Sequence, residues 1–472
     1  MPWLGSRRAD TMSLPVDLLH AVAADGGGRV VLVLGAGASV ERPTSLPLAS
    51  QCAQKAHRDL LADGVLSEGQ CASPDDLSLL ADTVADVTGG QSQLVERLPV
   101  AQFRSAEPND GSLIAAALLR EQAVACVLTL NFDLSMSTAL AQIGAGDVAI
   151  VPGPEAHHHL GTTNLIYLHR NVDADPESWV LRTAALDEEW RDRWEEVVAQ
   201  KVIAGSVTVF AGLGSPAAVL VESTRRIREA LPNGTTIFQV DPGERTESGF
   251  SAALGIQNDD YLQMTWCEFA TELGARLVTK HQHELSDACE AMIEAEGWDD
   301  GDSQDLCRRI AGLGLVDLGK LRARWTLDSA LYAPSRGGDV ELIVDLLLGI
   351  GVLERATGTT AVFDADGVVE LHRDGSTVGS IIVASGRGVK RWFTLEAEIG
   401  RHEHRRRSRP RPPAVALVGG VQGAATAAVA PPVNIATESD EQSIVTGGES
   451  GLTLVSVDDL RSSVEDVAGM VA

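Results

Sequence analysis

Small and polar residues follow five short apolar runs within the first 280 residues of this 472-residue chain. The first run ends in a turn of glycine and alanine, and the others end in groups such as amides, carboxylates and an imidazole. Glycine lets backbone N–H groups approach a phosphate, and histidine, whose ordinary pKa is about 6.5, can accept a proton near neutral pH. The residues concerned are Gly35, Ala36, Gly37, Ser39, Asn131, Asp133, His169, Gly212, Ser215, Gln239 and Asp241. Together they predict a site for a phosphorylated ligand with a base beside it.

Each of these residues also has a structural interpretation that requires no ligand. The turn after Leu34 could simply join a strand to a helix, since Val40 stands where the dinucleotide fingerprint has its third glycine. Asn131 and Asp133 could cap the helix that follows them, and His169 could be a packed core residue. The functional interpretation is favoured because small or polar residues recur at five consecutive run ends.

The apolar runs predict strands of one parallel sheet. Val30–Leu34 lacks any polar alternation, which is typical of a strand buried on both faces. The other runs are Ala123–Leu130, Asn164–His169, Ser206–Gly212 and Thr235–Val240. Helical patterns lie beside them at Leu14–Ala24, after Asp133, from Leu186, from Pro216 and at Trp266–His281. This alternation predicts an α/β fold, a Rossmann-like doubly wound parallel sheet that binds ligands beyond the carboxyl ends of its strands.

Three regions are expected: a sheet domain over 1–280, a helical linker region over 281–358 and a smaller α/β or α+β domain over 359–472. The pattern of the last region resembles the core of restriction-endonuclease-like domains, in which Glu370 would take the first metal position. The next strand ends in Val383–Arg387 and lacks the Glu-x-Lys of those nucleases. A recognition or assembly module is therefore expected rather than a nuclease, with a small-molecule sensor domain as the alternative.

The composition narrows the classes of partner. A formal net charge of −28 disfavours general binding to a nucleic-acid backbone, although one basic segment, Arg401–Pro413, stands out as a linker or docking site. The sequence contains no uninterrupted run of eighteen apolar residues, so no segment is expected to span a membrane. The six cysteines include no Cys-x-x-Cys pair, and three adjacent histidines at His157–His159 rarely converge on one ion, so no metal is expected. These features predict a cytoplasmic protein with reduced thiols.

The ordered set of motifs resembles the sirtuin family over roughly the first 280 residues. Sirtuins have Gly-Ala-Gly-x-Ser, Asn-x-Asp, a histidine at a strand end, a Gly-x-Ser turn and a ribose-binding Asn-x-Asp, in the order found here. This chain differs in having Arg170 after the histidine, Leu130 before Asn131, and no zinc-binding cysteine pairs. Ser45-Leu46-Pro47 is similar to a segment of the sirtuin-like proteins of bacterial antiphage defence, which hydrolyse NAD.

The resemblance implies a role for each candidate residue. Gly35, Ala36, Gly37 and Ser39 would hold the phosphates of NAD, Asn131 would orient the ribose or a water, and Asp133 would lie near the carboxamide. His169 would be the general base, Gly212 and Ser215 would line the adenosine side, and Gln239, in the segment that includes Asp241, would contact its ribose. The expected activity is hydrolysis of the nicotinamide–ribose bond without zinc.

Two other functions remain open: a nucleotide-binding sensor or scaffold without turnover, favoured by Arg170 and Leu130, and a protein deacylase, disfavoured by the missing zinc module. The resemblance further implies a homo-oligomer that is not bound to a membrane. Its possible partners are a HerA-type ATPase or an Argonaute-like protein.

Overall fold

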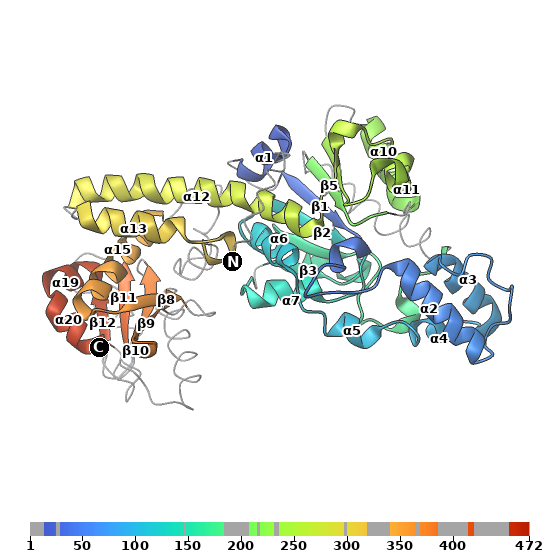
Figure 1. Cartoon of the computed structure of the whole chain (residues 1–472), viewed down its shortest axis with the longest axis horizontal. Helices are drawn as coiled ribbons and strands as arrows, with labels where there is room; N and C mark the ends of the chain where they lie inside the picture. Colours follow the sequence, from blue (N-terminus) through green and yellow to red (C-terminus); the bar gives the residue numbers. More distant parts are fainter. Residues whose placement is uncertain are drawn as a thin grey trace, which may run out of the picture. The chain divides into compact units, whose positions relative to one another are not determined.

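A computed structural model describes residues 14–24, 29–145, 148–183, 207–214, 218–230, 236–296, 300–318, 340–363, 369–385, 414–419 and 453–471 (Figure 1). The contacts divide the chain into two compact units, one holding 1–141 and 145–277 and the other 142–144 and 278–472. The division falls within one helix, α12 (Trp266–Glu296), which we predicted to end at His281. The periodic burial of Leu285 and Cys289 explains why the helix continues.

The first unit contains a seven-stranded parallel sheet in the order β3-β4-β2-β1-β5-β6-β7. All five residues of β1 are buried, so both faces of the sheet are covered at its centre. This arrangement confirms the predicted α/β class with a doubly wound parallel sheet. The strands are β1 (Val30–Leu34), β2 (Val124–Thr129), β3 (Ala149–Val151), β4 (Asn164–Tyr167), β5 (Val207–Ala211), β6 (Thr236–Val240) and β7 (Tyr261–Leu262).

Most predicted elements of this unit coincide with observed ones. The five predicted strands are β1, β2, β4, β5 and β6, and three predicted helices are α1 (Val16–Ala23), α7 (Ser135–Gln142) and α10 (Ala218–Ala230). The two strands that the sequence did not predict, β3 and β7, are the outermost and span only three and two residues. The predicted helix from Leu186 lies outside the described residues.

A helical insertion lies between β1 and the helix α6 (Asp110–Arg120) that precedes β2. Its core also includes side chains from the loops after β2 and β4, among them Phe132, Val172 and Trp179. The insertion therefore packs on the loops that carry the candidate polar residues. It consists of α2 (Ala49–Ala62), α3 (Leu77–Thr88), α4 (Ser92–Val95) and α5 (Val100–Arg104).

The second unit has its own sheet of five strands in the order β12-β11-β10-β9-β8. Strands β8, β9 and β10 are antiparallel, whereas β10, β11 and β12 are parallel. The strands are β8 (Thr360–Phe363), β9 (Val369–Arg373), β10 (Ser376–Ser385), β11 (Ala414–Gly419) and β12 (Thr453–Ser456), and the helices are α13 (Asp300–Ala311), α15 (Val340–Thr357), α19 (Val457–Ser462) and α20 (Val464–Val471). This smaller domain with mixed strands and helices confirms the expected class, while the basic segment Arg401–Pro413 lies outside the described residues.

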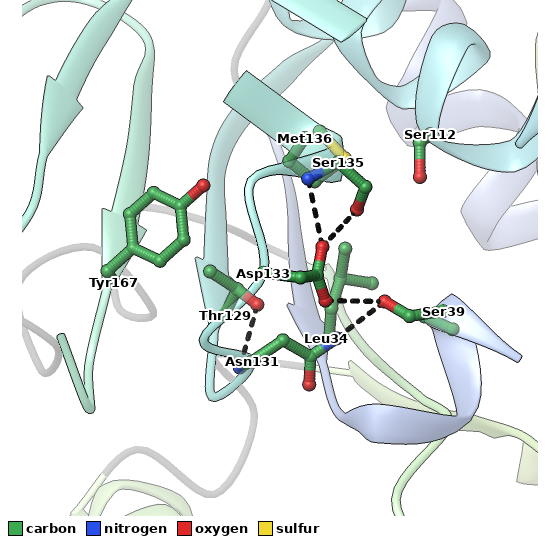
Figure 2. Close-up of a pocket in the computed structure, with 10 residues that line it drawn as sticks. Leu34, Ser39, Ser112, Thr129, Asn131, Asp133, Ser135, Met136 and Tyr167 are labelled. Atoms are coloured by element: carbon green, nitrogen blue, oxygen red, sulfur yellow. Dashed lines mark hydrogen bonds between the residues drawn. The ribbon is translucent and has the colours of Figure 1, made fainter. Parts of the chain in front are cut away.

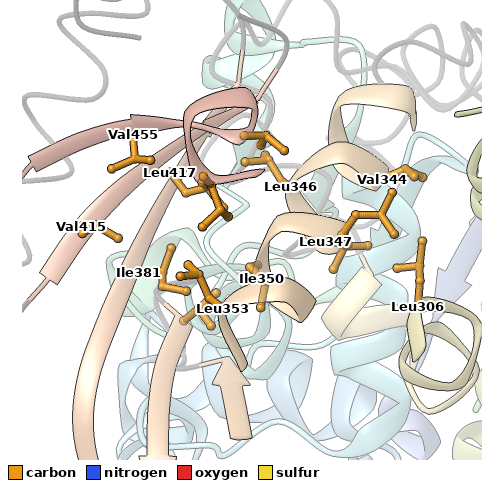
Figure 3. Close-up of a cluster of buried hydrophobic side chains, with 14 of the residues drawn as sticks. Leu306, Val344, Leu346, Leu347, Ile350, Leu353, Ile381, Val415, Leu417 and Val455 are labelled. Atoms are coloured by element: carbon orange, nitrogen blue, oxygen red, sulfur yellow. The ribbon is translucent and has the colours of Figure 1, made fainter. Parts of the chain in front are cut away.

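A separate hydrophobic core holds the second unit together (Figure 3). Leu347 and Ile350 of α15 face Ile381 and Leu417 of the sheet, and Leu306 of α13 packs on the same helix. Every one of these side chains is at most 2% exposed. Among the described residues of the whole chain, no helix is long and apolar enough to cross a membrane.

Candidate functional site

The pairing of the strands brings the predicted site residues that the structure describes to one edge of the seven-stranded sheet, at the carboxyl ends of its strands. Leu34 of β1 lies opposite Thr129 of β2 and Ala211 of β5, and Thr129 lies opposite Tyr167 of β4. Asn131 and His169 therefore each follow their paired residues by two positions, on neighbouring strands of the same edge. The chain order reverses direction across the sheet between β1 and β5, which is where open α/β sheets bind ligands.

A chain of hydrogen bonds links an amide, a hydroxyl and a carboxylate at this edge (Figure 2). The Asn131 amide nitrogen donates to Ser39 Oγ at 3.1 Å and to the Gly35 carbonyl at 3.0 Å. Ser39 Oγ in turn donates to Asp133 Oδ2 at 2.9 Å. Among the described residues no donor reaches the Asn131 amide oxygen, and the side chain is only partly buried. That oxygen is consequently available to accept a hydrogen bond from a water or a ligand hydroxyl.

Asp133 caps a helix, as its structural interpretation allows, and also bonds to the turn after β1. Its Oδ1 accepts the Ser135 backbone N–H at 2.9 Å, at the first residue of α7, as a helix cap does, and also accepts the Ser135 hydroxyl. Its Oδ2 accepts the Ser39 hydroxyl from the turn after β1. The carboxylate is 5% exposed, so these bonds replace the water it has lost. Asp133 thus fixes the start of α7 to the glycine-rich turn.

A small cavity of about 10 Å³ lies beside this network, which is the space that one water needs. Hydroxyl-bearing residues from five elements line it, and one of them, Tyr167, has its Oη 2.7 Å from Ser137 Oγ. Burial raises the pKa of Tyr167, so its hydroxyl stays protonated at neutral pH. Four lining residues, Ser112, Thr129, Ser135 and Tyr167, were not predicted from the sequence. The available signal for Thr129 and Tyr167 is their position as the last strand residues before the polar turns.

The glycines at this edge serve close packing between two turns. A Cβ on Gly35 would lie 2.6 Å from the Gly212 carbonyl oxygen, and one on Gly37 would lie 2.7 Å from the Gly212 Cα. The Gly37 N–H donates to the Gly212 carbonyl at 3.0 Å, and the Gly35 N–H donates to the Ala211 carbonyl at 2.9 Å. These two amides are therefore already bonded within the protein in this conformation. Phosphate binding by the turn, including Ala36, stays a prediction.

His169 lies two residues after β4 and is partly buried. Burial lowers the pKa of its imidazole to about 4, and a hydrogen bond with the Leu130 backbone opposes only part of that shift. The ring lies 6.3 Å from that of Phe132, which is stacked on Trp179 at 4.4 Å. At neutral pH the imidazole is consequently uncharged and able to accept a proton. Its two neighbours, the Leu130 backbone and the Phe132 ring, belong to the residues that flank Asn131 in the chain.

The residues predicted to line the adenosine side make hydrogen bonds within the protein. Gln239 is fully buried, and its amide nitrogen donates to the Leu213 carbonyl at 3.2 Å and to Ser248 Oγ at 2.9 Å. Asp241 Oδ1 accepts the Gly243 N–H at 2.8 Å within its own turn. Gly212 packs against the first turn as described, and Ser215 lies outside the described residues.

Among the described residues no group of three or more histidine, cysteine or carboxylate side chains could hold a metal ion. His158 and His159 lie in a short 3-10 helix (Pro154–His159), with ring centroids 4.1 Å apart. In the second unit, Glu370 Oε2 lies 2.9 Å from His372 Nε2 and accepts the Thr377 hydroxyl at 3.2 Å.

Comparison with known proteins found likeness only among solved structures. No protein-family model and no curated protein matches the chain. A mutant Sir2 homologue with 2′-O-acetyl ADP ribose is similar at 16% identity and a TM-score of 0.35, over 57% of this chain and 98% of that one. A Sir2 homologue–NAD complex has 15% identity and a TM-score of 0.33, over 57% and 95%. A Sir2–p53 peptide–NAD+ structure has 15% identity and a TM-score of 0.29, over 56% and 96%.

Proposed function

We propose that the first unit binds NAD and hydrolyses the bond between its nicotinamide and ribose. The observation that carries this proposal is the Asn131 amide oxygen, which no donor among the described residues reaches, at the same sheet edge as the uncharged imidazole of His169. The order of motifs along the sequence, from the glycine-rich turn to the strand-end histidine, supports the same ligand.

The reaction needs little acid catalysis but careful orientation. As the C–N bond breaks, its electron pair returns to the pyridinium ring, so nicotinamide leaves as a neutral molecule. Positive charge develops on the ribose, as in glycoside hydrolysis, until a water oxygen bonds to the anomeric carbon and loses a proton. The Asn131 amide oxygen would hold a ribose hydroxyl or that water, and His169 would accept a proton from the hydroxyl it contacts.

The network behind Asn131 supports this orientation. Because its amide nitrogen is bonded to both Ser39 and the Gly35 carbonyl, the side chain cannot rotate without losing two hydrogen bonds. Asp133 would lie near the carboxamide, while its bond to Ser39 holds the hydroxyl that Asn131 contacts. An immobile acceptor costs no reorganisation as charge develops, which is the usual source of electrostatic catalysis.

The test is release of nicotinamide and ADP-ribose from NAD by the purified full chain. His169→Ala and Asn131→Ala should each lower the rate by at least about a hundredfold, the size expected for loss of a base or an orienting group. His283→Ala, which removes an exposed histidine of α12, is the matched control and should keep full activity. Undiminished release by either site variant, with folding verified by circular dichroism, would contradict the proposal.

A second candidate is a nucleotide-binding sensor or scaffold without turnover, favoured by Arg170 at the position after the histidine. Binding of NAD without release of nicotinamide would support it. Release that depends on an acylated peptide would instead indicate a deacylase, the least favoured function because the sequence lacks the zinc-binding cysteine pairs.

The biological setting that we propose is a regulated effector of bacterial antiphage defence. Uncontrolled loss of NAD would be toxic, so assembly into a homo-oligomer or contact with a partner, such as a HerA-type ATPase or an Argonaute-like protein, would switch the activity on. Nicotinamide release should therefore rise when the protein is assayed together with the products of neighbouring genes.

A further inference from the structure

Arg170 has a backbone conformation that its residue type disfavours. Its φ is +73°, in the left-handed region where a side chain crowds the backbone and glycine is strongly preferred. The residue directly follows His169 and belongs to the turn that leaves β4. Such conformations persist only where surrounding contacts hold them, and they occur preferentially at functional sites.

The Arg170 side chain extends to an ion pair on the neighbouring strand end. Its Nη1 lies 2.9 Å from Glu155 Oε2, and its side chain is only 11% exposed. Glu155 belongs to the 3-10 helix that follows β3. A Cβ on Gly153 would lie 1.9 Å from the same Nη1 and 2.5 Å from Glu155 Oε1. Gly153 thus leaves the space in which the ion pair sits.

The strand order shows which way this contact points. Strand β4 lies between β3 and β2. The guanidinium reaches toward the end of β3, whereas Asn131 follows β2 on the opposite side of β4. An ion pair on the β3 side can anchor the turn after β4 without entering the site on the β2 side. Residue 170 is thereby separated from the ligand position even though it adjoins the histidine.

We propose that the Arg170–Glu155 ion pair, seated over Gly153, holds the turn after β4 in its left-handed conformation and so positions His169. Arg170 is a positioning residue that does not touch the substrate. The role assigned to His169 rests on the proposed function, whereas the conformation of the turn does not. Glycine needs no side-chain contact to adopt a positive φ, so it can replace Arg170 where alanine cannot.

Two substitutions at one position provide the test. Arg170→Ala removes the ion pair and retains a Cβ, and we expect kcat to fall about tenfold or more while KM changes less than twofold. Arg170→Gly removes the ion pair but tolerates the turn, and should keep kcat within about threefold of the unmodified chain. Glu155→Gln should resemble Arg170→Ala, and combining it with Arg170→Gly should cause no further loss. Equal losses in the alanine and glycine variants, or a rise in KM alone, would indicate a substrate contact and overturn the proposal.

A second readout separates this inference from the proposed function. The His169 imidazole is titrated by NMR in the full-length chain, with its signal assigned through His169→Asn. The pKa should be about 4 in the unmodified chain, should rise in Arg170→Ala as the loosened turn admits water, and should change little in Arg170→Gly. If the unmodified chain releases no nicotinamide, the proposed function fails, and this titration still decides the role of Arg170. An identical pKa in all three proteins would overturn the inference.

Discussion

Burial of the His169 imidazole makes the free energy of unfolding depend on pH. The imidazole titrates at about 4 in the folded chain and at about 6.5 when unfolded, so the unfolded chain binds a proton that the folded chain excludes. The free energy of unfolding should therefore decrease as pH falls from about 6.5 toward about 4. Between pH 7 and pH 5.5 the loss from this residue should be about 1 kcal/mol.

Urea denaturation at a series of pH values measures this effect, with His169→Asn as the reference. The variant lacks the titrating group, so the difference between the two proteins should narrow at low pH. Parallel curves at every pH would show that the imidazole is hydrated in the folded chain.

Replacing the Asp133 carboxylate with a neutral amide should lower the stability of the first unit. In Asp133→Asn one carboxylate oxygen becomes an N–H₂ group, so either Ser39 or the Ser135 hydroxyl and N–H lose their acceptor. Leaving buried donors unpaired should cost about 1–3 kcal/mol of stability. Asp173→Asn is the matched control, because that carboxylate pairs with Arg104 on the surface, where an ion pair contributes less than about 1 kcal/mol. Chemical denaturation that finds equal losses in both variants would refute the network.

Much of the site follows from residue types at strand ends, but its bonding does not. A pattern of apolar runs ending in Asn131 and His169 suffices to place both residues at one edge, because parallel strands end together. The direction of the Asn131 amide could not be predicted, since it depends on the Gly35 carbonyl, a backbone group nearly a hundred residues away. The role of Gly35 and Gly37 was similarly hidden, because Gly212 reaches them only after β5 has joined the sheet.

At the scale of elements, the contact between the turns after β1 and β5 requires glycine. Gly212 has a φ of +69°, and a Cβ there would lie 2.3 Å from the Ala38 backbone nitrogen. Gly212→Ala should therefore destabilise the first unit by roughly 2 kcal/mol or more, since both the backbone conformation and the packing oppose it. Gly214→Ala should have little effect, because nothing lies within 4 Å of a Cβ at that position. Thermal unfolding of the two variants compares them directly, and similar midpoints would contradict the close approach.

Element prediction succeeded where burial imposes a long, uniform pattern. Strand β1 is buried along its whole length and therefore has an unbroken apolar run. Strand β3 is an outermost strand and has only three residues, of which Ile150 is exposed. It therefore has no long continuous apolar run that would identify it in the sequence. The helical insertion after β1 was not predicted because its short helices draw part of their core from distant loops, including Trp179.

Among the described residues, the two units draw on separate hydrophobic cores, and this predicts how the molecule unfolds. Phe210 belongs to the core around the seven-stranded sheet, and Leu347 belongs to the core around the five-stranded sheet. Each is 1% exposed, so truncation to alanine should cost about 2–5 kcal/mol of the stability of its own unit.

Calorimetry of the full chain should resolve two transitions. Leu347→Ala should lower the midpoint of one transition by roughly 5–15 °C and leave the other in place, and Phe210→Ala should do the reverse. If one transition alone were observed, and both variants shifted it equally, α12 would have to couple the two units into a single cooperative structure. The reciprocal shifts are expected instead, because the side chains that form each core come from separate parts of the chain.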